Sequence, residues 1–238
     1  MVQEKSMNSY TTGLKDGIPI GLGYLSVSFT FGMMAVNTGF PVGIALLISM
    51  TNLTSAGQFA GIGLMAAGAP YIEMALTQLV INMRYALMSL SVAQKADQSF
   101  HLFHRLLISF GITDEVFAVA SGKPGDIGVR YMYGLITIPY LGWALGTLLG
   151  AAASTLLPET AGSALGIAIY GMFIAIIIPP AKHSKPVLKV LLLSVAISCA
   201  LRFAPVLSRL SGGFAIIICA LAASIAGAIF FPVEDVAK

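Results

Sequence analysis

The sequence predicts an all-α polytopic membrane protein with about eight transmembrane helices, at least one of them broken. Three observations predict this class. Of the 238 residues, 57% are hydrophobic and only 10% are charged, whereas a soluble domain carries about 25% charged residues. The mean hydropathy is +0.89. Apolar runs of about twenty residues, long enough to cross the hydrocarbon core, recur along the chain.

The first four expected spans cover the N-terminal half of the chain. Residues 17–37 form the first run, which ends in a segment of asparagine, glycine and proline. Residues 41–66 form the second, which polar and small residues interrupt. The third, 71–93, is followed by glutamine, lysine and aspartate, and the fourth, 102–121, contains a Thr-Asp-Glu step. Each is long enough to span the bilayer as a helix.

The other four expected spans follow the same logic. They are residues 131–153, residues 162–180, which end in two prolines, residues 186–203, and residues 212–231, which stop before another proline. The whole chain, residues 1–238, is expected to form a single transmembrane domain. No cleavable leader is expected, because the first sixteen residues are polar and the first apolar run is long enough to span.

Loop charges orient these spans. With a cytoplasmic N-terminus and eight crossings, eight basic residues lie in cytoplasmic loops and three lie outside, as the positive-inside rule requires. Both termini are then cytoplasmic. If 102–121 does not cross, the lysines between 182 and 189 face outward, which the rule disfavours. Seven crossings remain an alternative, because 186–203 is short and carries a charge near each end.

Glycine and proline recur in the first and fifth spans and suggest a diverged internal repeat. The residues concerned are Pro19, Gly21 and Gly23 in the first span, and Pro139, Gly142 and Gly146 in the fifth. With Gly150, the glycines of the fifth span follow a four-residue spacing that leaves one smooth helix face. The expected role of this face is close packing against another helix.

Several function classes are disfavoured by what the sequence lacks. A net charge of +3, scattered along the chain, is too small for a nucleic-acid footprint. No phosphate-binding loop, HExxH motif or Cys/His cluster occurs. We therefore expect no enzyme, no cofactor, no metal site and no nucleic-acid partner.

Polar residues crowd the middle of the second span. Asn52, Ser55 and Gln58 belong to this group, together with two threonines, and Gly57 lies among them. Serine and threonine hydroxyls can bond to their own helix or to a neighbouring one. Alternatively, the helix is broken near Gly57, and the new helix N-terminus binds a substrate carboxylate. Both alternatives stay open from the sequence.

The third span carries Asn82 and Arg84 near its middle, and Glu73 near its start. Glu73 is expected to reach the interface. Arg84 is too deep to reach water easily, so it needs an anionic partner. That partner is either an acidic residue of the next span or the carboxylate of a substrate.

Asp114 and Glu115 are adjacent carboxylates in a span that is otherwise apolar. An acidic side chain at bilayer depth costs about 2.5–3.5 kcal/mol, which usually marks an ion, proton or substrate path. The two diverge by about 100° around a helix, so one is expected to face a pathway and the other a partner. Two carboxyls this close favour proton exchange at one of them. Alternatively, both lie in water at the cytoplasmic end.

Four stretches give the chain a resemblance to the AzlC family of branched-chain amino acid exporters. They are 17–32, which begins Gly-Ile-Pro, 55–59, which ends Gln-Phe, 82–85, which reads Asn-Met-Arg-Tyr, and 111–118, which reads Gly-Ile-Thr-Asp-Glu-Val-Phe-Ala. Their order and spacing agree over residues 13–121. Tyr85 departs from the family's usual histidine, and Ser26 from its frequent proline.

The resemblance implies a secondary transporter of the prokaryotic inner membrane. It would export leucine, isoleucine, valine and similar apolar amino acids such as methionine, driven by an ion gradient, most simply protons. A small membrane protein of the AzlD family would be its partner. We take Asn52, Ser55, Gly57, Gln58, Asn82 and Arg84 as candidate substrate-binding residues and Asp114 and Glu115 as candidate proton-coupling residues. The alternatives are a non-transporting scaffold or regulatory subunit, and a passive amino acid channel.

Overall fold

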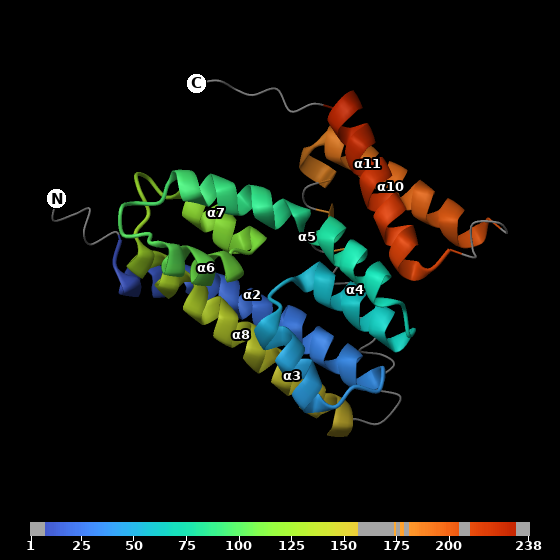
Figure 1. Cartoon of the computed structure of the whole chain (residues 1–238), viewed down its shortest axis with the longest axis horizontal. Helices are drawn as coiled ribbons and strands as arrows, with labels where there is room; N and C mark the ends of the chain where they lie inside the picture. The colour runs from blue at the N-terminus through green and yellow to red at the C-terminus, as the bar shows by residue number, and fades with distance from the viewer. Residues whose placement is uncertain (1–7, 157–173, 175–176, 179–180, 205–209, 232–238) are drawn as a thin grey trace. The chain divides into compact units, whose positions relative to one another are not determined.

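The computed structural model describes residues 8–156, 174, 177–178, 181–204 and 210–231. The predicted span 162–180 lies almost entirely outside them. The regular elements within the described residues are helices, which confirms the all-α class. In chain order the main helices are α2 (Tyr10–Asn37), α3 (Val42–Thr51), α4 (Ser55–Ala66), α5 (Tyr71–Gln94), α6 (Leu102–Phe110), α7 (Asp114–Gly122), α8 (Val129–Leu156), α10 (Lys185–Phe203) and α11 (Gly212–Phe230) (Figure 1).

Contacts within the chain divide it into two compact units. Unit 1 comprises Met1–Phe59 and Asn82–Gly166, and unit 2 comprises Ala60–Ile81 and Ile167–Lys238. Helices α4 and α5 each contribute one part to unit 1 and one part to unit 2. Unit 1 therefore contains α2, α3 and α6 to α8, while α10 and α11 belong to unit 2.

Helices α2 and α8 form the centre of unit 1, where they lie side by side (Figure 1). Glycines bring their backbones into contact. A side chain at Gly142 would lie 2.5 Å from the carbonyl oxygen of Gly21, and one at Gly17 would lie 3.2 Å from the ring of Pro139. The packing role expected for the glycines of the fifth span is therefore confirmed, and the two proline–glycine segments contact each other.

The same contacts give the direction of the pair. Gly13 meets Gly134, Gly21 meets Gly142, and contacts continue to the ends of both helices with the same offset. The two helices therefore run parallel. If both span the bilayer, they begin on the same side, and the chain between them crosses an odd number of times. The predicted topology has three crossings there, so the parallel packing favours it.

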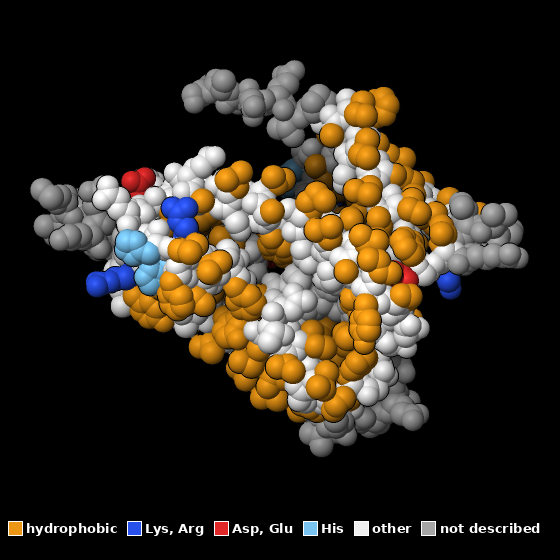
Figure 2. Space-filling model, in the orientation of Figure 1, with side chains coloured by type: hydrophobic (Ala, Val, Ile, Leu, Met, Phe, Trp, Pro, Cys, Tyr) orange, Lys and Arg blue, Asp and Glu red, His pale blue; other side chains and the backbone are white. Residues whose placement is uncertain are grey.

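Within the described residues, four helices are long and apolar enough to cross a membrane, namely α2, α8, α10 and α11. The predicted spans 41–66 and 102–121 are each two shorter helices, and α5 contains two charged residues, Glu73 and Arg84. Hydrophobic side chains cover much of the face seen in Figure 2, and charged ones are few on it. Leu22, Leu79 and Ile229 are among many large apolar side chains that are exposed, as lipid-facing helices require.

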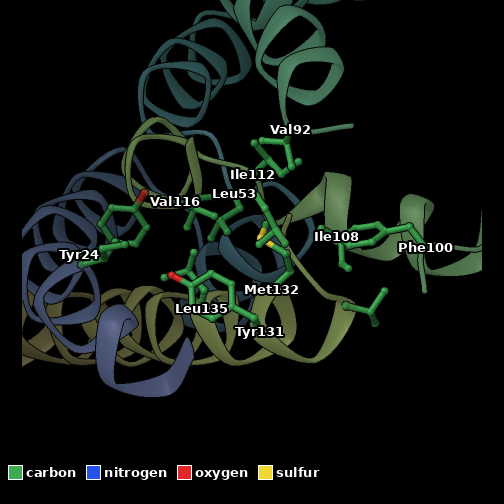
Figure 3. Packing of buried hydrophobic residues seen from close by; sticks show 14 of the residues in the cluster. Tyr24, Leu53, Val92, Phe100, Ile108, Ile112, Val116, Tyr131, Met132 and Leu135 are labelled. Carbon is green, nitrogen blue, oxygen red and sulfur yellow. The ribbon is translucent and has the colours of Figure 1, made fainter. Parts of the chain in front are cut away.

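The buried hydrophobic cluster of unit 1 lies between α2, α7 and α8 and extends to α6 (Figure 3). Val116, Met132 and Leu135 are completely enclosed in it. Tyr24 of α2 belongs to the same cluster, and its ring meets Trp143 of α8 edge to face, with ring centroids 5.1 Å apart. This packing holds the first turn of α7 against α2.

Candidate functional site

The second predicted span is interrupted at residues 52–54. Helix α3 ends at Thr51, Asn52 has an extended backbone, and α4 begins at Ser55. The short polar side chains compete with the backbone for hydrogen bonds and so favour a helix end here. The interruption expected near Gly57 therefore lies closer to Asn52, and Gly57 is in the first turn of α4.

The fourth predicted span contains a second interruption, which the sequence did not predict. Helix α6 ends at Phe110, and α7 begins at Asp114, where the Thr113 hydroxyl accepts a hydrogen bond from the Val116 amide over 3.4 Å. A side chain at Gly111 would clash with Ile136 of α8. Glycine therefore lets the chain pass close to α8 at this break.

The two interruptions and α5 line an open cavity of about 170 Å³ in unit 1. This is roughly the volume of five or six waters, which suits a small metabolite. Polar groups line one part of it and apolar groups the rest. The lining residues are Thr51, Asn52, Leu53, Thr54, Asn82, Tyr85, Ser109, Phe110 and Ile112.

Of the candidate substrate-binding residues, Asn52 and Asn82 line this cavity, while Ser55, Gly57, Gln58 and Arg84 do not. The buried Thr54 hydroxyl donates to Oδ1 of Asn82 over 2.6 Å. This hydrogen bond ties the first interruption to the middle of α5. Thr54 belongs to the polar run of the second span, so the sequence contained a signal for it.

Arg84 pairs with Asp114. Its Nη1 lies 2.7 Å from Oδ2 and 2.8 Å from Oδ1 of that carboxylate, and both side chains are close to half exposed. The guanidinium also lies 5.1 Å from the ring centroid of Tyr85, which lines the cavity. Of the anionic partners considered for Arg84, the structure places Asp114 in contact with it, next to the cavity wall.

Glu115 turns to a different partner. Its carboxylate accepts a hydrogen bond from the hydroxyl of Tyr24, which also lies 2.5 Å from the Thr113 hydroxyl. The adjacent carboxylates thus diverge, as expected from helix geometry, one toward α5 and the other toward α2. Nothing in the local sequence pattern identified Tyr24 as a partner of Glu115.

Gln58 lies in a third polar group, deeper in unit 1. It is 1% exposed, and its Nε2 donates to the Ser49 hydroxyl over 2.9 Å. Ser49 in turn lies 2.7 Å from the hydroxyl of Thr147 on α8. Among the described residues, Oε1 of Gln58 has no hydrogen-bond partner.

The structure corrects the expectation for Glu73. It was expected to reach the interface, yet it is 3% exposed and accepts a hydrogen bond from the Gly213 amide over 2.8 Å. The partner lies 140 residues further along the chain, so no local pattern could have revealed it.

Residues 19–157, more than half of the chain, match the family model described as AzlC protein. The inner membrane protein YgaZ of Escherichia coli is 29% identical over 71% of this chain and 72% of its own length. An uncharacterized membrane protein of Archaeoglobus fulgidus is 32% identical over 73% of this chain and 76% of its own. An uncharacterized membrane protein of Helicobacter pylori is 27% identical over 61% of this chain and 66% of its own length. No solved structure matches the chain.

Proposed function

Because this chain belongs to the AzlC protein family, we propose that it is a secondary transporter that exports branched-chain and similar apolar amino acids. The observation that carries the proposal is the cavity of about 170 Å³ where two interrupted helices meet. Interrupted helices at bilayer depth are a recurring way for transporters to expose backbone groups to a substrate. Related proteins are named as membrane proteins, which agrees with this location.

The groups that line the cavity are complementary to those of an apolar amino acid. Asn52, Thr54 and Asn82 offer amide and hydroxyl groups to the polar end of the substrate, and Leu53 and Phe110 offer apolar surface to its side chain. The N-terminus of α4, at residues 55–58, carries the partial positive charge that attracts a carboxylate. Oε1 of Gln58, which is buried outside the cavity wall, is an acceptor that an ammonium group could use only if the cavity opened toward it.

Proton coupling is proposed for Asp114 and Glu115. Arg84 is held by Asp114 through two short contacts. Protonation of Asp114 would remove the charge that holds Arg84, and the guanidinium could then bind the substrate carboxylate. Protonation of Glu115 would likewise weaken its hydrogen bond with Tyr24. In either case a proton would bias one of the two access states.

We further propose that both units act together as one transporter domain, with eight spans and both termini in the cytoplasm. The exporter would reside in the prokaryotic inner membrane and would work with a small AzlD-type partner. Four long apolar helices and the parallel packing of α2 and α8 support a multi-pass arrangement.

Flux measurements in proteoliposomes test this function. Radiolabelled leucine, isoleucine, valine and methionine are compared at two pH values, with the chain and its small partner present together and with each alone. We expect saturable flux from the pair that depends on the pH gradient. Flux that does not saturate would indicate a channel, and the same flux from the partner alone would indicate a scaffold role for this chain.

Charge-removing variants test the coupling residues. We expect Asp114→Asn and Glu115→Gln to lose the response to the pH gradient. Asp126→Asn is the matched control, because Asp126 is an exposed loop carboxylate. Normal proton-driven flux in both test variants would remove these carboxylates from the mechanism.

A further inference from the structure

Unit 2 contains a buried carboxylate that the proposed transport mechanism does not use. Glu73 lies in the first turn of α5 and is 3% exposed. No Lys, Arg or His side chain among the described residues pairs with it, and α11, against which it packs, contains no acidic or basic residue. An ionised carboxylate buried in this way is costly in a membrane. Its presence therefore indicates a function.

The surroundings of Glu73 suit both charge states of a carboxyl group. Its Oε1 accepts a hydrogen bond from the Gly213 amide at the N-terminus of α11, over 2.8 Å. This end of a 19-residue helix carries a partial positive charge of about half an elementary charge, which stabilises the ionised form. A protonated carboxyl has in addition one O–H group to donate, and it needs an acceptor.

Thr77 is the candidate for that acceptor. It lies four residues after Glu73, hence on the same face of α5. Its side chain is 0% exposed, and its hydroxyl has no hydrogen-bond partner among the described residues. Such orphaned buried hydroxyls are rare and call for an explanation. Glu73 can be its partner in either charge state, because a hydroxyl accepts from a protonated carboxyl and donates to an ionised one.

Gly213 allows the three groups to meet. A Cβ atom at this position would lie 2.5 Å from Oε1 of Glu73 and 2.7 Å from the hydroxyl oxygen of Thr77. Both oxygens therefore converge on the same point of the helix end, and any larger residue would displace α11 from α5.

We propose that Glu73, Thr77 and the N-terminal amides of α11 form a proton-binding site in unit 2. In the ionised state the carboxylate is bound to the end of α11. In the protonated state the carboxyl also donates to Thr77, and its hydrogen bond to Gly213 loses the contribution of the charge. Proton binding thus changes how strongly α5 and α11 are held together. The site is separate from Asp114 and Glu115, and the proposal does not depend on the transported substrate.

Infrared difference spectroscopy on the full chain in lipid nanodiscs tests the site without any transport assay. A change of pH should produce a carbonyl band of a protonated carboxyl group. Glu73→Gln should remove one carboxyl's contribution to this band. It should leave the fold intact, because glutamine can accept from Gly213 and donate to Thr77. Thr77→Val should shift the same band, since it removes only the acceptor.

Two controls separate this site from the other carboxylates and from a metal cation. Asp114→Asn should leave in place the part of the band that Glu73→Gln removes, and replacing sodium with potassium in the buffer should not alter that part. The proposal is overturned if Glu73→Gln leaves the difference spectrum unchanged, if Thr77→Val does not shift the band, or if the band responds to sodium and not to pH. Failure of transport in flux assays would leave these results unaffected.

Discussion

The hydrogen bond from Thr54 to Asn82 connects the interruption between α3 and α4 to the middle of α5. We expect Thr54→Val to weaken substrate binding. Valine keeps nearly the same shape but removes the hydroxyl that donates to Asn82 over 2.6 Å. The Asn82 side chain, which lines the cavity, then loses one of the contacts that orient it.

The size of the effect follows from the burial of this contact. Side-chain hydrogen bonds between membrane helices contribute about 0.6 kcal/mol on average and about 1.7 kcal/mol at most. The loss of a hydrogen-bond partner by a fully buried group costs about 1–3 kcal/mol, and Asn82 is only partly buried. Since Thr54 is buried, we expect a loss of about 1–2 kcal/mol, which corresponds to a factor of roughly 5–30.

The assay is the concentration dependence of branched-chain amino acid flux in proteoliposomes that contain the chain and its small partner. Thr54→Ser keeps the hydroxyl and should retain most of the affinity. Thr30→Val is the matched control, because among the described residues the Thr30 hydroxyl bonds to its own helix, at the Ser26 carbonyl oxygen. The reasoning fails if Thr54→Val keeps the wild-type half-saturation concentration, or if Thr30→Val loses as much affinity.

Three further predictions concern unit 1. Gly142→Val should lower the thermal unfolding midpoint in detergent, at a cost of at least about 1–3 kcal/mol, because the valine side chain would press on the α2 backbone. Gly23→Ala is the control: Gly23 has open space around it, so this variant should gain about 0.5–1 kcal/mol. Equal midpoints for the two variants would contradict the packing argument. Arg84→Asp and Asp114→Arg should each reduce amino acid flux, and the double variant with both exchanges should recover part of the lost flux. If the double variant recovers no flux, transport does not require the ion pair itself. Tyr24→Phe should cost about 1–3 kcal/mol of stability, because the Glu115 carboxylate loses the Tyr24 hydroxyl as a donor. An unchanged midpoint would show that this hydrogen bond contributes little.

The sequence predicted the helical membrane class and the interruption of the second span, because composition and a dense polar run are local signals. Of the two alternatives that the polar run left open, the one with a broken helix placed the break near Gly57. The structure ends α3 at Thr51, where Asn52 is extended. Polar side chains that compete with the backbone, and not the glycine, determine where this helix stops.

The second interruption shows which signal was overlooked. Thr113 followed by Asp114 and Glu115 is a helix start, with a capping hydroxyl and acidic residues in the first turn. A search for continuous apolar spans treats the same residues as a charged step inside one helix. The signal for the break was present in the sequence, but it was assigned to the wrong structural role.

The contacts that complete the sites could not be predicted from one sequence. Glu73 meets Gly213, and Tyr24 meets Glu115, across separations of 140 and 91 residues. Such pairs depend on which helices pack together, and a periodic apolar pattern does not specify neighbours. Arg84 and Asp114 were accessible to reasoning only because each needed an opposite charge at similar depth.

The glycine-lined contact between α2 and α8 has a mechanical consequence. Backbone lies against backbone along most of both helices, so sliding one past the other by a single residue would drive side chains into carbonyl groups. We therefore expect the two helices to move as one rigid unit. Any motion within unit 1 is then expected in the short segments α3, α6 and α7, at the helix ends near residues 52–54 and 111–113.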